Sequence, residues 1–323
     1  MASATRLETL EDPLRILVTG TSGNLGSYLV RHLKTRPGVR VIPWRGPGAG
    51  SASLGSISVD LLDPRRVESE FRRARPAAVI HAAGITTVAV CRADRGKDFA
   101  VNAAATARLG ALAFERNCRF VYLSTDLVFD GTAAPYAEEA QPTPWCVYGE
   151  SKLAGEAAID GAPAGLGLIL RLGLLYGPTL IERPAFFDAV VRGMLAGRTP
   201  DLFLDEWRTP LPLDAAAEAI AAAALDPRAT DELGLRRRLH VGGPERLSRH
   251  DFGLRTARYL GLDSTCIRGA SRLSHDTPEP RPADTSLVSS RWRAAFPLTR
   301  QPALEAGLAG LGLAGAPPPA NEG

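Results

Sequence analysis

Long apolar runs are absent from this chain. No stretch approaches about eighteen uncharged apolar residues, the length that indicates a membrane-spanning helix. The first thirteen residues include Glu8, Glu11 and Asp12 and contain no apolar segment of the kind found in secretory leaders. We therefore expect a cytoplasmic protein with no membrane partner.

Cysteine is also scarce. The four cysteines, Cys91, Cys118, Cys146 and Cys266, stand far apart and form no CxxC pair. A zinc site or a disulfide framework would need closely or regularly spaced cysteines. The sequence thus predicts reduced thiols and no metal.

An excess of charge of one sign is missing as well, because the net charge is only +3 over 323 residues. The basic residues are scattered, so we expect no nucleic-acid partner. With 45% hydrophobic and 23% charged residues, the composition is that of an ordinary globular protein. The length predicts one large domain or two interleaved ones.

The chain does contain an alternation of short apolar runs with longer helical patterns, beginning near Leu14. Continuous apolar runs are typical of parallel strands buried on both faces, and the alternation is typical of crossover helices. We predict an α/β fold, a doubly wound parallel sheet of the Rossmann type. The predicted strands are Ile16–Thr19, Val39–Pro43, Ile57–Val59, Ala78–His81, Phe120–Leu123 and Leu168–Leu172, and the predicted helices are Leu25–Lys34, Arg65–Ala74, Asp98–Arg116 and Ser151–Ile159.

The pattern changes after Tyr176, which predicts a smaller α/β lobe toward the C-terminus. Its predicted elements are helices over Ala185–Ala196, Ala215–Leu225 and His250–Leu260 and a strand at Leu239–Val241. We assign 1–13 to an N-terminal tail, 14–176 to the Rossmann domain and 177–313 mainly to a substrate-binding lobe interleaved with it. The proline-rich end, 314–323, is predicted to be disordered.

A glycine-rich turn follows the first predicted strand and opens the first helix: Gly20-Thr21-Ser22-Gly23-Asn24-Leu25-Gly26. Glycines allow the backbone to approach a pyrophosphate, whose charge then lies at the positive end of the helix. The alternative is a tight turn that binds nothing. Because the turn stands between a strand and an amphipathic helix, we expect a dinucleotide to contact Gly20, Ser22, Gly23, Asn24, Leu25 and Gly26.

A missing residue type indicates which dinucleotide this is. NAD-binding folds place a carboxylate about 20 residues after the glycines to bind the ribose hydroxyl, but no acidic residue occurs between Asp12 and Asp60. Arg45 closes the second strand instead, where a guanidinium can pair with a 2′-phosphate. NADPH is therefore predicted, with Arg40 as a second candidate and a solvated loop arginine as the alternative. Asp60 and Leu61, after the third strand, are expected near the adenine.

Tyr148 and Lys152 are four residues apart, so on a helix they share one face. A phenol with a pKa of about 10 is a poor acid near neutrality, and a neighbouring ammonium favours its ionised form. The chain has only three lysines, which suggests that the compact ammonium is needed at this position. We predict that Tyr148 donates a proton and that Lys152 lowers its pKa. Both residues are also expected to contact the cofactor, with Lys152 holding its ribose. A surface ion-pair helix is the alternative.

Further polar residues follow the fifth and fourth strands, whose carboxyl ends bind ligands in open α/β sheets. Thr125 is predicted to hydrogen-bond a substrate carbonyl, with Ser124 as the alternative donor and Asp126 as a further substrate contact; a turn-forming cluster competes with each. Asn102 is expected at the cofactor site, where it could hold a water that reprotonates the lysine. Ala82, Ala83 and Gly84 are expected beside the cofactor, and His81 is expected to be packed and not a base.

A resemblance supports these assignments. The segments Ser124-Thr125-Asp126-Leu127-Val128-Phe129-Asp130-Gly131, Val147-Tyr148-Gly149 and Lys152-Leu153-Ala154-Gly155-Glu156 are similar to those of the dTDP-4-dehydrorhamnose reductase family, and Arg281 to Leu287 resembles its segment near the C-terminus. The resemblance implies an extended short-chain dehydrogenase fold and reduction of a 4-keto group on a nucleotide-linked deoxysugar. It implies Thr125, Tyr148 and Lys152 as the catalytic set, and it is compatible with a homodimer.

The resemblance leaves alternatives open. Asp205 to Pro210 corresponds only loosely to the family's Asp-Gln-x-Gly-x-Pro-Thr stretch, so Arg208 either contacts a substrate diphosphate or pairs with Glu206 or Asp205. Leu127 stands where related dehydratases have a glutamate, which disfavours dehydration. The other functions considered are an NADP-binding regulatory subunit resembling that of methionine adenosyltransferase and a nucleotide-sugar epimerase.

Overall fold

The computed structural model describes residues 12–48, 55–181, 185–226, 238–274 and 281–313. The predicted disordered segment 314–323 and residues 1–11 of the predicted N-terminal tail lie outside the described residues.

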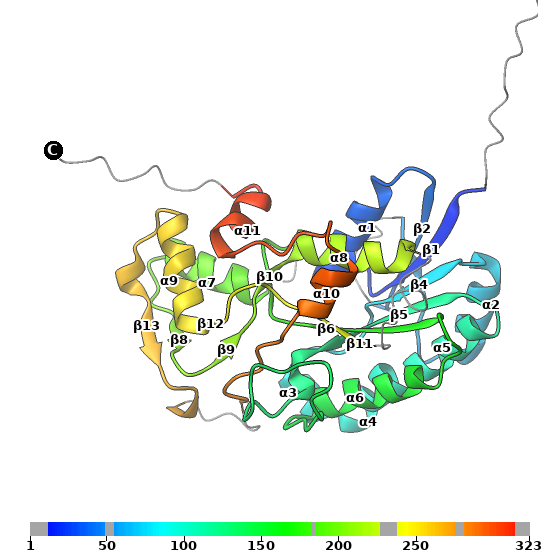
Figure 1. The fold of residues 1–323 in the computed structure, drawn as a ribbon, viewed down its shortest axis with the longest axis horizontal. Helices are drawn as coiled ribbons and strands as arrows, with labels where there is room; N and C mark the ends of the chain where they lie inside the picture. The colour runs from blue at the N-terminus through cyan, green and yellow to red at the C-terminus, as the bar shows by residue number, and fades with distance from the viewer. Residues whose placement is uncertain (1–11, 49–54, 182–184, 227–237, 275–280, 314–323) are drawn as a thin grey trace, which may run out of the picture.

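A seven-stranded parallel sheet forms the centre of the molecule (Figure 1). Its order is β11-β6-β5-β4-β1-β2-β3, so the chain reverses direction across the sheet between β1 and β4. Ligands bind at the carboxyl ends of strands beside such a reversal. The strands are β1 (Leu14–Thr19), β2 (Val39–Arg45), β3 (Ile57–Ser58), β4 (Ala78–His81), β5 (Arg119–Thr125), β6 (Gly167–Leu172) and β11 (Arg238–Val241). The predicted Rossmann-type sheet is confirmed.

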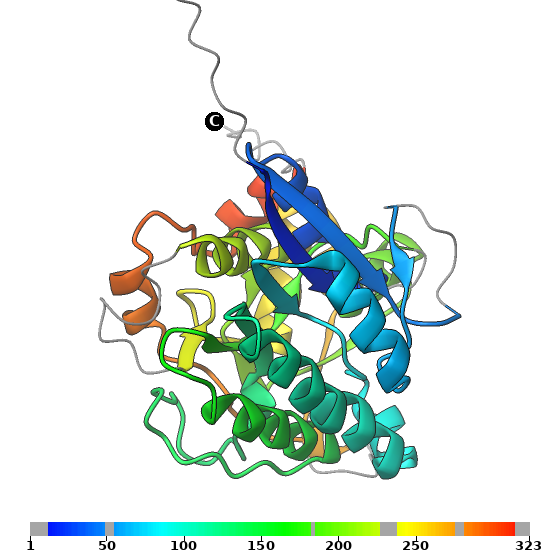
Figure 2. The ribbon, with the colours of Figure 1, turned by 90° about the vertical axis from the view of Figure 1, so that its right-hand side faces the viewer.

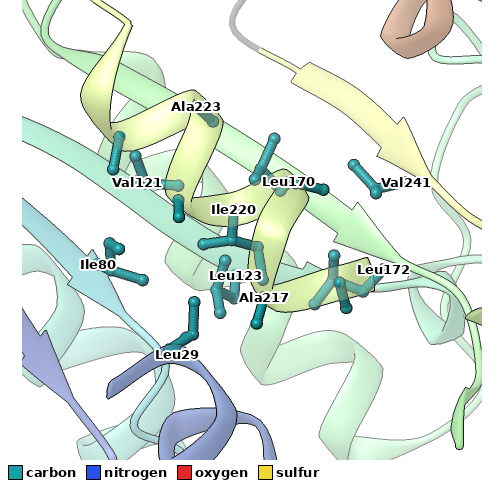
Figure 3. Packing of buried hydrophobic residues seen from close by; sticks show 14 of the residues in the cluster. Leu29, Ile80, Val121, Leu123, Leu170, Leu172, Ala217, Ile220, Ala223 and Val241 are labelled. Atoms are coloured by element: carbon teal, nitrogen blue, oxygen red, sulfur yellow. The ribbon is translucent and has the colours of Figure 1, made fainter. Parts of the chain in front are cut away.

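Helices cover both faces of the sheet, and Figure 2 views these layers from the β1–β2 side. One face packs against α1 (Asn24–Lys34), α8 (Leu213–Leu225) and α10 (Ser290–Ala295), and the other against α2 (Pro64–Ala74), α5 (Ala105–Phe114) and α6 (Val147–Asp160). Helix α8 is rich in alanine, which lets it lie close to the strands. Figure 3 shows Ala217 and Ile220 of α8 among Val121, Leu123 and Leu170 of the sheet.

Two elements assigned to the C-terminal lobe belong to the sheet layers instead. Strand β11 pairs with β6 in parallel, and α8 packs against α1 and the sheet. The apolar faces of these elements need a partner, and the open edge of β6 and the uncovered sheet face provide it. The two parts of the fold are therefore interleaved.

Elements from the C-terminal half of the chain form a smaller lobe beside the end of the sheet (Figure 1). They comprise α7 (Phe186–Leu195), α9 (Arg249–Tyr259) and α11 (Leu304–Gly310) with three two-stranded pairs, β7 (Leu175–Tyr176) with β10 (Leu211–Pro212), β8 (Asp201–Phe203) with β13 (Arg268–Ala270), and β9 (Trp207–Arg208) with β12 (Leu247–Ser248). Buried aromatic residues, among them Phe187 and Phe252, form its core.

The predicted helix over Asp98–Arg116 is interrupted. It consists of α4 (Arg95–Phe99), a π-helical turn η1 (Ala100–Ala104) and α5, and α3 (Val88–Ala93) precedes it. π-Helical turns are rare and are frequent at functional sites. The short 3-10 turns are η2 (Asp126–Val128), η3 (Ser264–Cys266) and η4 (Arg272–Ser274).

Candidate active site

The glycine turn lies in backbone contact with the neighbouring strand end. Gly20 has φ +73°, and a Cβ on it would lie 2.6 Å from the Ala83 nitrogen and 2.7 Å from the Ala82 carbonyl carbon. A Cβ on Gly26 would lie 2.2 Å from the Gly20 oxygen. The turn, the first turn of α1 and the segment after β4 thus approach one another more closely than any side chain permits.

The N-terminus of α1 is open to an anion. Gly23 is its N-cap and provides no side-chain cap, and the first turn has no acidic residue. The Asn24 Oδ1 atom is buried without a hydrogen-bond partner among the described residues, while Ser22 is exposed. Free amides at the positive end of a helix match a pyrophosphate. The residues present therefore fit a dinucleotide, with Leu25 packing its side chain against the core.

The end of β2 places Arg45 at the rim of this site. The Trp44 carbonyl accepts hydrogen bonds from the amide and the hydroxyl of Thr21, at 3.1 and 3.0 Å, so the strand end is fixed to the glycine turn. Arg45 follows, half-buried and opposite Ser58 of β3.

Asp60 and Leu61 lie just beyond β3. The exposed Asp60 carboxylate accepts the Leu62 amide at 2.9 Å, and the Leu61 carbonyl accepts Nη1 of Arg108 at 3.3 Å. Their expected contact with an adenine stays a prediction.

His81 is a buried structural link at the end of β4. Its Nδ1 lies 2.8 Å from the Thr19 hydroxyl, which accepts the Ala83 amide, and its Nε2 lies 3.0 Å from the Thr106 hydroxyl. Burial, and then the charge of Lys152, lower the pKa of His81 to about 3. His81 is therefore neutral and packed, as predicted, and it ties the segment with Ala82, Ala83 and Gly84 to β1.

The sequence predicts this helix from Ser151, but α6 begins at Val147. Tyr148 therefore lies in the first turn of the helix and does not precede it. Its glycines let it approach the turn after β5, because a Cβ on Gly149 would lie 2.1 Å from the Leu127 oxygen. The Tyr148 ring packs with Cys91 and Cys146 and is 9% exposed. Burial raises the pKa of Tyr148, and a hydrogen bond with the Thr125 side chain opposes this. The predicted lowering by Lys152 is not found in this structure, where burial has the largest effect and the charge of Asp126 also raises the pKa of Tyr148.

Lys152 lies one turn further along α6 and is 4% exposed. Its Nζ lies 4.1 Å from the centroid of the Tyr122 ring, a cation–π distance. Burial lowers the pKa of Lys152 to about 7, and the charges of Glu156 and Asp98 oppose this. The lysine therefore titrates near neutrality.

Thr125 and Asp126 end β5 and begin the turn beside Tyr148. The Thr125 hydroxyl donates to Oδ1 of Asp126 at 3.2 Å and accepts the Leu127 amide at 3.2 Å. Oδ2 of Asp126 accepts the Thr285 hydroxyl at 2.7 Å and lies 3.5 Å from Nε of Arg208. Burial raises the pKa of Asp126.

Three residues predicted as substrate contacts have protein partners. Ser124 donates to Glu156 at 2.6 Å, so it faces inward. Asp126 holds Thr285 and Arg208, as described above. Arg208 is 4% exposed and also lies 3.3 Å from Glu206, which fits the alternative of an internal ion pair. Buried polar groups need such partners, and the contacts of Asp126 with Thr285 and Arg208 tie the lobe to the end of the sheet.

Asn102 is buried and fixed by several hydrogen bonds. Its Nδ2 lies within hydrogen-bond distance of the Ile85 carbonyl, Asp98 and Ser151, at 2.9, 2.6 and 3.1 Å, and its Oδ1 accepts the Ile85 amide at 2.9 Å. These partners use both hydrogens of the amide, and the expected contact with a water stays a prediction. It joins the segment after β4 to α6.

A profile of the RmlD substrate binding domain family matches residues 14–310. The chain belongs to this family. A relative in Haloferax volcanii, named probable low-salt glycan biosynthesis reductase, is 32% identical over 91% of this chain and 96% of its own. The dTDP-4-dehydrorhamnose reductase of Streptomyces griseus is 31% identical over 87% of this chain and 88% of its own.

A solved structure has the same fold as this RmlD-family chain. It is a hypothetical dTDP-4-dehydrorhamnose reductase from Sulfolobus tokodaii, with a TM-score of 0.77 and 29% identity over 91% of this chain and 98% of that one. None of the helices in the described ranges is both long and apolar enough to cross a membrane.

Sequence reasoning missed two groups of charged residues around this family's tyrosine and lysine. Glu156 forms a fully buried ion pair with Arg171 of β6 behind Lys152. In the lobe, Glu206 contacts Arg208, Arg249 and Arg281, whose charges lower its pKa to about 2 despite burial. The sequence offered Glu206 as one possible partner of Arg208, but it gave no sign of the pairs with Arg249 and Arg281 or of the pair between Glu156 and Arg171.

Proposed function

We propose that this protein is an NADPH-dependent reductase that acts on the keto group of a nucleotide-linked deoxysugar, most simply the 4-keto group named by its relatives. The observation that carries the proposal is the placement of Tyr148 and Lys152 on one buried face of α6, with Thr125 beside them at the carboxyl end of β5. This group lies next to the strand reversal where the glycine turn is open to a dinucleotide.

When bound, NADPH supplies the hydride. Tyr148 donates its proton to the carbonyl oxygen, and because burial favours the neutral phenol, the tyrosine carries the proton that it must give. Thr125 polarises the same oxygen when its hydroxyl turns from Asp126 to the substrate. Lys152 stabilises the phenolate that forms and holds the ribose. Arg45 would pair with the 2′-phosphate of the bound cofactor and so favour NADPH over NADH.

The arginines around Glu206 support a diphosphate-bearing substrate. Glu206 is ionised and 0% exposed, so three guanidinium groups surround one carboxylate. Nη1 of Arg249 is buried without a hydrogen-bond partner among the described residues. Guanidinium groups with donors to spare suit phosphate oxygens. We assign Arg249 and Arg281 to the substrate diphosphate.

The test is a titration of the purified protein with NADPH and NADH, followed by NADPH oxidation on adding dTDP-4-dehydrorhamnose and other keto sugars. Preferred NADPH binding with turnover is expected. NADPH binding without turnover of any ketone would point to a regulatory subunit, and substrate interconversion without net NADPH consumption to an epimerase. Either result would refute the proposed reductase.

A further inference from the structure

A fully buried ion pair lies directly behind Lys152. Glu156 follows Lys152 by four residues on α6, which places the two side chains one turn apart on the same face. Glu156 and Arg171 are 0% and 1% exposed. Arg171 donates to both carboxylate oxygens, from Nε at 2.9 Å and from Nη2 at 2.7 Å. The carboxylate is therefore paired with the guanidinium through two hydrogen bonds and fixed in orientation.

The same carboxylate is tied to the strand that ends in Thr125. Ser124 donates to Oε1 of Glu156 at 2.6 Å, and Ser124 and Arg171 are direct neighbours in the β5–β6 register. Glu156 thus connects the helix that carries Tyr148 and Lys152 with the strand that carries Thr125.

Packing alone does not account for this arrangement. Removing two charges from water is costly, and apolar residues of similar volume often stabilise a core equally well or better. A buried carboxylate next to a buried ammonium does something that apolar residues do not, because it favours the charged form of the lysine.

Other groups also face Lys152 from the surrounding elements. Asp98 of α4, like Glu156, raises the pKa of Lys152, and Cys91 of α3 raises it more weakly. The neutral ring of His81 and the phenols of Tyr122 and Tyr148 carry no charge near neutrality. Arg171 and Arg238 are the cations beyond Glu156, and Arg238 lies 3.4 Å from it. Of these charges, that of Glu156 raises the pKa of Lys152 the most.

We propose that Glu156, held by Arg171 and Ser124, is a positioning residue that keeps Lys152 protonated and directed at the reaction site. The inference rests on the proposed role of Lys152. It predicts that Glu156→Gln leaves the guanidinium of Arg171 without a counter-charge and makes the lysine lose its proton at lower pH.

Because the chain has only three lysines, the charge of Lys152 can be followed directly. In protein labelled with ¹³C at the lysine side chains, the Cε signal of Lys152 is assigned with Lys34→Arg and Lys97→Arg and titrated with pH. We expect the midpoint to lie near neutrality in the wild type and at least one pH unit lower in Glu156→Gln. The alkaline limb of kcat/KM should move by the same amount, giving a tenfold or greater loss at pH 8.

Glu156→Asp keeps the charge but shortens the side chain, so it should keep the midpoint and the pH profile even if the protein melts at a lower temperature. The double variant Glu156→Gln with Arg171→Met removes both members of the buried ion pair. Its Lys152 midpoint should also fall, so this variant provides the test if Glu156→Gln alone does not fold. An unchanged midpoint in the folded Gln variant would overturn the inference, as would an equal shift in Glu156→Asp. Activity retained in Lys152→Met would instead contradict the proposed function, and the NMR titration is independent of turnover.

Discussion

The sharpest structural prediction concerns two glycines with the same backbone conformation and different surroundings. Gly20 in the cofactor turn has φ +73°, and Gly38, just before β2, has φ +72°. A Cβ on Gly20 would lie within 2.7 Å of backbone atoms of Ala82 and Ala83, whereas a Cβ on Gly38 would meet nothing within 4 Å. Substitution by alanine at both sites therefore separates the cost of the conformation from the cost of the contact.

The left-handed conformation costs an alanine ~1–2 kcal/mol, so Gly38→Ala should lower the free energy of unfolding by that amount. Gly20→Ala carries the same conformational cost. Its new methyl group must also displace the backbone just after β4, and such overpacking destabilises by a further ~1–3 kcal/mol. That displacement moves the amides that face the pyrophosphate. We expect NADPH binding to weaken at least tenfold in Gly20→Ala and to stay within about twofold of the wild type in Gly38→Ala.

Urea unfolding measures the stability difference, and NADPH fluorescence measures the binding. If Gly20→Ala bound NADPH as the wild type does, the close approach of the turn to Ala82 and Ala83 would not be part of the cofactor site. Equal losses of NADPH binding in both variants would show a general destabilisation, and would also contradict a specific role of this contact in the cofactor site.

Three further substitutions test single assignments. Arg45→Ala should weaken NADPH binding by ~10–100-fold, because it removes a charge-assisted contact of ~1.5–3 kcal/mol, and it should leave NADH binding unchanged. If the ratio of NADPH to NADH affinity did not change, Arg45 would not be the residue that contacts the 2′-phosphate. Thr125→Val should lower kcat by roughly a hundredfold at unchanged NADPH affinity, as loss of a hydrogen-bond donor to the reacting oxygen does, and a steady-state rate near that of the wild type would contradict this role. Arg249→Gln should raise KM for the nucleotide sugar at least tenfold with little change in kcat, whereas an equal effect on a ketone without a diphosphate would refute the assignment.

Features that depend on nearby residues could be predicted from the sequence. All seven strands of the central sheet were predicted as strands because each contains a short apolar run, and the glycine turn was predicted because it stands between a strand and a helix. The shared face of Tyr148 and Lys152 follows from their spacing alone and is confirmed by α6.

Features that depend on distant residues could not. Asp126 finds its partner Thr285 159 positions away, and β11 joins the sheet across the lobe that precedes it. The inward orientation of Ser124 follows from Glu156, a residue quoted in the sequence motif without a role. The pKa of Tyr148 was predicted from charge alone, and burial, which is invisible to a spacing argument, decides its direction.

The central claim is that Tyr148 donates the proton when NADPH reduces a keto sugar. The most direct test is a single-turnover measurement of NADPH oxidation with dTDP-4-dehydrorhamnose in the wild type and in Tyr148→Phe, at matched NADPH occupancy. The account predicts oxidation in the wild type and a rate at least a thousandfold lower, on the order of the loss of general acid catalysis, in a variant that still binds NADPH. A Tyr148→Phe variant that oxidises NADPH at the wild-type rate would contradict it.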